Sequence, residues 1–99
     1  MANQEQKAHF MWLLESLPED LRSCFDIDKP SVDTETLKEN YETLSSGEKI
    51  MLKFISQVYT GGGNFFEKLK EIDIVKDAGR LSENNWEKIA TWWKDPYWI

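Results

Sequence analysis

The sequence predicts an all-α fold, a compact orthogonal bundle of five to six short helices in a single domain that spans residues 1–99. Apolar residues recur at intervals of three and four positions in several segments, as the buried face of a helix requires. No segment alternates between apolar and polar residues over the length of a strand. A chain of 99 residues has the size of one domain, and no linker or internal repeat divides it.

The N-terminal third predicts two helices followed by a loop. Residues 4–17 carry one apolar face, which consists of Ala8, Met11, Trp12, Leu14 and Leu17. Pro18 interrupts this helix and, together with the acidic residues that follow it, begins a second short helix. This second helix directs Leu21 and Cys24 inward, so we expect a buried thiol. Residues 26–30 combine aspartates with a proline, which predicts a loop.

Two further helices are predicted in the middle of the chain. Asp33 is placed to cap the first of them. Its buried face consists of Leu37, Tyr41 and Leu44. Ser45 and Glu48 have the spacing of a capping box at the start of the second helix, and glycines 61–63 end it. A wide apolar face makes this second helix the expected centre of the core, and it consists of Ile50, Met51, Phe54, Ile55, Val58 and Tyr59.

The C-terminal third predicts the last two helices. The first starts at Asn64, which has capping spacing to Glu67, and it ends at Gly79 in a left-handed conformation. Its apolar face consists of Phe65, Leu69, Ile72 and Val75. Ser82 caps the final helix, which stops at residues 95–96. The expected buried face of that helix consists of Trp86, Ile89, Ala90 and Trp93.

Acidic residues give the chain a net charge of −6, and the excess lies in its first half. Residues 1–47 hold ten acidic and four basic residues, whereas residues 48–99 hold eight of each. Direct nucleic-acid binding is not expected, because it needs clustered lysine and arginine. Membrane insertion is not expected either, because no apolar run approaches the roughly 20 residues that cross a bilayer. The N-terminus lacks the features of a secretory signal, which predicts a cytoplasmic protein.

No residue pattern marks a catalytic, cofactor or metal site, so we expect a non-enzymatic protein with no cofactor and no metal. His9 is the only histidine, and a metal site built from several imidazoles is therefore excluded. The carboxylates show no calcium-loop pattern. A small enzyme of unknown type stays open as a third interpretation, and it requires a pocket that contains His9 or clustered carboxylates.

The leading functional interpretation is a small protein-interaction or adaptor module that binds an unknown protein partner through its C-terminal aromatic residues. These candidate partner-binding residues are Trp92, Trp93, Tyr97 and Trp98. Trp92 and Trp93 diverge by about 100° on a helical wheel, so both cannot point fully inward. An exposed tryptophan is typical of a binding hot spot. Two alternatives stay open, in which the tail folds back over the bundle or the tryptophans join two copies in a homodimer.

The second functional interpretation is an acidic regulator or inhibitor of a nucleic-acid-binding protein. Its candidate acidic surface consists of Glu35, Glu39 and Glu42, on the outer side of the third predicted helix. Such a surface can engage a basic protein or imitate the phosphates of DNA. An ordinary solvated helix face explains the same residues. The compact pattern with few loops suits many small bacterial or phage proteins.

Overall fold

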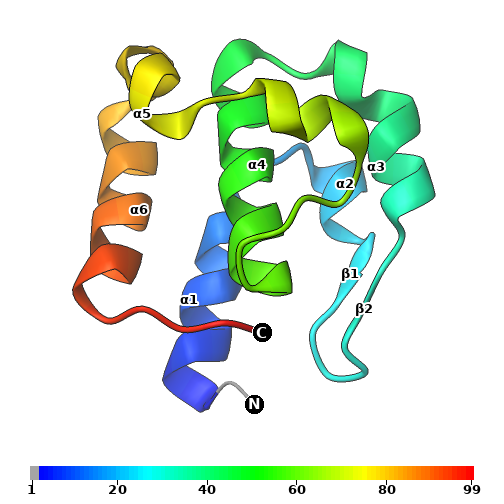
Figure 1. The fold of residues 1–99 in the computed structure, drawn as a ribbon. Helices are drawn as coiled ribbons and strands as arrows, with labels where there is room; N and C mark the ends of the chain where they lie inside the picture. The colour runs from blue at the N-terminus through cyan, green and yellow to red at the C-terminus, as the bar shows by residue number, and fades with distance from the viewer. Residues whose placement is uncertain (1–2) are drawn as a thin grey trace.

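Helices make up most of the chain in the computed structural model, which describes residues 3–99 (Figure 1). Six α-helices lie in this range: α1 (Gln4–Leu14), α2 (Glu19–Arg22), α3 (Thr34–Asn40), α4 (Ser46–Thr60), α5 (Ile74–Asp77) and α6 (Glu83–Lys94). Three 3-10 helices, η1 (Tyr41–Thr43), η2 (Glu67–Glu71) and η3 (Ala78–Arg80), and a hairpin of β1 (Phe25–Asp26) and β2 (Ser31–Val32) join them. The prediction of a small all-α domain is confirmed.

The helix predicted to be central, α4, stands in the middle of the fold (Figure 1). Its capping box forms as expected: the Ser45 hydroxyl accepts from the Glu48 N–H at 3.2 Å, and the Glu48 carboxylate accepts from the Ser45 N–H at 2.8 Å. The helix ends at Gly61, whose φ of +75° is the left-handed conformation that glycine adopts without strain. Most of its side chains are buried, so α4 contacts the rest of the core on several sides.

The first helix is shorter than predicted, and its buried face is confirmed only in part: Leu14 and Leu17 are buried as expected, whereas Ala8 is exposed. The helix ends at Leu14, and two turns of backbone hydrogen bonding then lead into Pro18. Phe10 and Leu13 are fully buried, whereas Met11, assigned to the core by its spacing, is exposed. Every position from 10 to 14 is apolar, so periodicity alone cannot choose the face that packs against α4 and α6.

The expected loop after α2 is a small hairpin. Its two-residue strands pair antiparallel, with Phe25 opposite Val32 and Asp26 opposite Ser31. The Asp26 carboxylate accepts from the backbone N–H groups of two loop residues, at 3.1 and 3.2 Å, which stabilises the turn. Strands this short have no room to show an alternating pattern, and the sequence therefore did not reveal them.

Residues 64–80 were predicted as one helix, and this prediction is wrong. The segment forms η2, α5 and η3 instead. Asn64 caps nothing: its Oδ1 is buried without a hydrogen-bond partner in the described part of the chain, and η2 begins at Glu67 with no side-chain cap. The N–H of Phe65 instead donates to the Ser56 hydroxyl of α4 at 2.7 Å. Asp73 caps a new helix by accepting from the N–H groups of the two residues after Ile74, and Val75 consequently points to solvent. Gly79 is not left-handed; within residues 3–99 only the two glycines after α4 have positive φ.

Burial of Cys24 is confirmed. Burial raises the pKa of its thiol, and the negative charges of Asp33 and Asp20 add to this effect. A thiol held protonated in this way is a small apolar core group. Along the described part of the chain, no helix is long and apolar enough to cross a bilayer.

Candidate partner-binding groove

The face of the last helix that packs against the core differs from the predicted one. Ser82 caps α6 as predicted, through its hydroxyl and the Asn85 N–H at 3.2 Å. The buried positions are Lys88 and Ile89, with Trp92 half-buried beside them. Three of the four residues assigned to the buried face are therefore wrongly placed, because Trp86, Ala90 and Trp93 are exposed.

The C-terminal tail folds back along the bundle. The Trp92 indole Nε1–H donates to the backbone oxygen of Tyr97 at 2.8 Å, and the Ile99 N–H donates to the backbone oxygen of Val58 at 3.2 Å. Tyr97 is buried as a result. The alternative in which the tail covers the bundle therefore holds for Tyr97, and this residue leaves the set of exposed candidate partner-binding residues.

A histidine fixes the tail to the first helix. His9 Nδ1 lies 2.6 Å from the Tyr97 hydroxyl, and His9 Nε2 lies 3.1 Å from the backbone oxygen of Lys88. Because a carbonyl only accepts, neutral His9 carries its proton on Nε2, and Nδ1 accepts from Tyr97. Burial lowers the pKa of His9, with the Lys88 carbonyl acting in the opposite direction, and burial raises the pKa of Tyr97. Both ring nitrogens are thus engaged within the protein.

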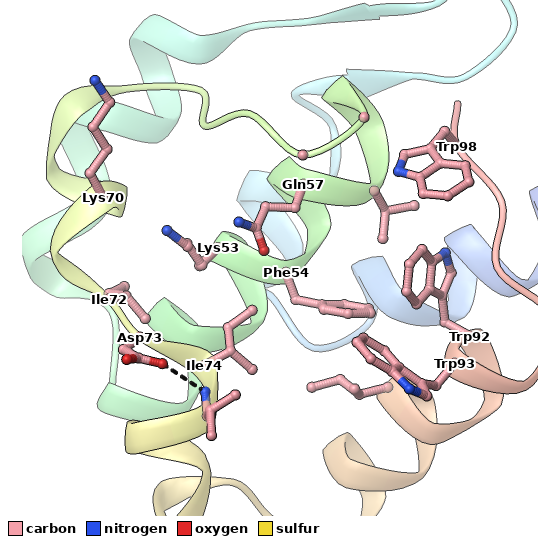
Figure 2. Close-up of a pocket in the computed structure, with 15 residues that line it drawn as sticks. Lys53, Phe54, Gln57, Lys70, Ile72, Asp73, Ile74, Trp92, Trp93 and Trp98 are labelled. Atoms are coloured by element: carbon pink, nitrogen blue, oxygen red, sulfur yellow. Dashed lines mark hydrogen bonds between the residues drawn. The ribbon is translucent and has the colours of Figure 1, made fainter.

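A groove of about 620 Å³ lies between α4, α6 and the segment that leads into α5. Figure 2 shows the three tryptophans of the C-terminal region gathered at one end of it. Trp92 is the central ring: its centroid lies 5.4 Å from Phe54, 5.6 Å from Trp93 and 5.7 Å from Trp98, edge-on to the first and last of these. Trp93 and Trp98 remain 71% and 52% exposed. The structure therefore brings together three of the four predicted partner-binding residues.

The opposite end of the groove carries a buried lysine. Lys53 of α4 is 8% exposed, and its Nζ donates to the backbone oxygen of Leu69 at 3.0 Å. Within residues 3–99, no carboxylate lies within 4.0 Å of this ammonium group. Lys70 and Asp73 line the same end, next to Ile72 and Ile74 (Figure 2).

No protein-family model matches the chain, and no curated protein or solved structure is significantly similar to it. The functional site is therefore inferred from the geometry of the groove. Sequence reasoning missed Lys53 and the isoleucines around residue 73. One signal in the sequence could have identified Lys53. This lysine is the only charged residue in the otherwise apolar run from Ile50 to Ile55, and lysine is rarely buried in a helix of the core.

Among residues 3–99, only part of the candidate acidic surface is free of ion pairs. Glu35 and Glu39 are exposed on α3, one helical turn apart. Glu42 lies in η1 and forms ion pairs with Lys68 and, at 3.8 Å, with Lys49. The hydrogen bond and positive charge of Lys68 lower the pKa of Glu42. The positive charges of Lys49 and Lys68 therefore offset the negative charge of Glu42.

A second, smaller hollow of about 210 Å³ adjoins His9. Glu5 and Asp95 line it, together with Tyr97. The histidine at its wall has no free ring nitrogen, so it is not available there as a proton acceptor. Across residues 3–99, no three histidine, cysteine, aspartate or glutamate side chains are grouped so that they could hold a metal ion.

Proposed function

We propose that this chain is a small non-enzymatic protein-interaction module, and that it binds a segment of a partner protein in the groove between α4 and α6. The observation that supports this proposal is the exposure of Trp93 and Trp98 at the mouth of an apolar groove. Tryptophan is the residue most strongly enriched among interface hot spots. An exposed apolar patch beside a hollow is a common feature of recognition surfaces.

The groove is held in shape before any partner arrives. Trp92 is fixed by the hydrogen bond from its indole to the tail, and Phe54 supports its ring from α4. The bond from Ile99 to Val58 fixes the chain on the far side of Trp98. Binding to a preformed site loses less conformational entropy than binding to a flexible one, which favours recognition by this surface.

The proposal predicts that Trp93→Ala and Trp98→Ala each abolish partner capture without unfolding the protein. Loss of one hot-spot tryptophan costs about 2 kcal/mol or more of binding free energy, about a thirtyfold loss of affinity. The measurement is capture from native lysate by immobilised protein, with quantitative mass spectrometry. Thermal unfolding of each variant checks the fold.

Trp86→Ala is the matched control, because Trp86 is an exposed tryptophan of the same helix that does not line the groove. It should retain every captured protein. Equal capture by wild type, Trp93→Ala and Trp98→Ala would contradict the proposal. Loss of capture by Trp86→Ala alone would move the binding surface toward the N-terminal turns of α6.

A further inference from the structure

We infer that the partner segment is an acidic, apolar peptide, which places two apolar side chains against Trp93 and Trp98 and one carboxylate against Lys53. This inference rests on the proposed function and adds the chemistry of the partner. It follows from the two ends of the groove, which differ in character: aromatic rings form one, and a buried ammonium group lies at the other (Figure 2).

Lys53 is a charge that the described fold does not pair. An ammonium group has three N–H donors, and Nζ uses one of them on the neutral Leu69 carbonyl. A buried charge without a counter-ion is costly, and an apolar side chain at this position of α4 would pack without that cost. A carboxylate that enters the groove from outside would supply the missing counter-ion.

Of the two lysines that line the groove, Lys53 is the one with no ion pair within residues 3–99. Asp73 is the one acidic residue that lines the groove, and its Oδ1 already accepts from the N–H groups of Val75 and Lys76. Lys70 lines the same end, and its only ion pair is with the exposed Glu67, three residues away on η2. In the part of the chain that the structure describes, the lining of this end thus consists of an unpaired Lys53, an ion-paired Lys70 and an aspartate whose Oδ1 is occupied, on a chain whose net charge is −6. The local charge is complementary to an acidic partner.

The groove is built entirely from residues 53–98, whereas the acidic excess of the chain lies in residues 1–47. Figure 1 shows α3 and the hairpin on one side of α4, and α5 and α6 on the other. An acidic segment can therefore approach the groove without crossing the glutamates of α3. A second copy of this chain would bring its own charge of −6 and is a less favourable occupant.

An open groove suits a peptide better than a small molecule. Its rim residues Val75, Trp93 and Trp98 are all exposed, so a small ligand would keep much of its surface in water. Small-molecule sites bury most of their ligand. A partner segment instead covers the rim with its own backbone and side chains, and its anchors fill the hollow.

Selection from a displayed library of random peptides on the immobilised protein tests the inference. Wild type should recover sequences that share two apolar residues and one aspartate or glutamate at a fixed spacing. Lys53→Met, which keeps the aliphatic stem and removes the charge, should recover the apolar pair without the acid. An acid-containing peptide from the wild-type pool should bind Lys53→Met about tenfold more weakly than wild type.

Lys76→Met is the matched control, because Lys76 is an exposed lysine of α5 outside the groove, and it should leave the recovered consensus unchanged. The peptide offers a measurement that needs no protein variant: changing its acid to the amide should weaken binding to wild type about tenfold. The same change should have no effect on Lys53→Met. The measurement on wild type tests the requirement for a carboxylate even if a Lys53 variant fails to fold.

The possible failures are distinguishable. An apolar consensus without an acid, in peptides that still lose affinity for Trp93→Ala, overturns this inference and leaves the proposed function standing. Peptides that bind Trp93→Ala and Trp98→Ala as well as wild type, or a selection that recovers nothing, contradict both proposals. A dimer that forms at high concentration in sedimentation and is lost in Trp93→Ala would make a second copy the occupant of the groove, and would overturn the inference.

Discussion

Single side chains at the C-terminus separate structural from recognition roles. Tyr97 and Trp98 are adjacent in the chain, yet Tyr97 is buried against His9 and Trp98 borders the groove. The extended tail places consecutive side chains on opposite sides. Trp92 and Trp93 diverge in the same way, because successive residues of a helix lie about 100° apart. Of these four residues, Trp92 and Tyr97 therefore hold the tail, and Trp93 and Trp98 are exposed to a partner.

The burial of His9 predicts a pH dependence of stability. Burial holds the pKa of His9 below its ordinary value of 6.5, so the unfolded chain takes up a proton at a pH at which folded His9 is still neutral. The stabilising contribution is complete above pH 6.5 and is lost as the pH falls through the folded-state pKa. Urea unfolding at several pH values should show this loss in wild type.

His9→Gln should lose less stability than wild type over the same pH range, because glutamine keeps an acceptor for Tyr97 and does not titrate. Comparing the two proteins removes the contribution of carboxylates with lowered pKa, such as Asp33 and Glu42, which both share. Parallel curves for wild type and His9→Gln between about pH 7 and pH 5 would show that His9 does not couple folding to protonation.

At the scale of elements, local capping signals determine where helices start. The capping box of α4 satisfies two backbone donors that would otherwise lack a partner. Ser45→Ala should lower the free energy of unfolding by about 1 kcal/mol, measured by urea denaturation. Ser46→Ala is the control, because Ser46 is the exposed next residue and makes no cap bond, and it should change stability by less than about 0.5 kcal/mol. Equal effects of the two substitutions would contradict a capping role.

The same scale shows where sequence reasoning succeeded and where it failed. Asp33, Ser45 and Ser82 cap helices as predicted, because a cap depends on residues three positions apart. The segment 64–80 does not form the single helix that its apolar periodicity predicts, because two of its backbone groups bond to side chains of α4. The N–H of Phe65 donates to the Ser56 hydroxyl, and the Leu69 carbonyl accepts from Lys53. Such bonds join residues that are distant in sequence, so a local sequence pattern does not predict them.

For the whole molecule, the sequence indicated one wall of the groove and not the other. The surplus of tryptophan near the C-terminus pointed to Trp92, Trp93 and Trp98, and all three line the groove. The facing wall comes from α4 and from residues 70–75, and their approach to α6 is set by packing of the complete bundle. The role of Lys53 could not be predicted from the sequence, because the groove that contains it is formed by three segments that are far apart in the chain.

The most direct test of the central claim is nuclear magnetic resonance of the labelled protein as a peptide from the display selection is added. The five tryptophan indole N–H groups give separate signals, of which Trp93 and Trp98 report on the groove and Trp86 on the N-terminal turns of α6, outside the groove. We predict that the signals of Trp93 and Trp98 shift together with the backbone amide of Gly61, while Trp86 stays unchanged. Shifts confined to Trp86, or to Glu35 and Glu39 of α3, would contradict the account.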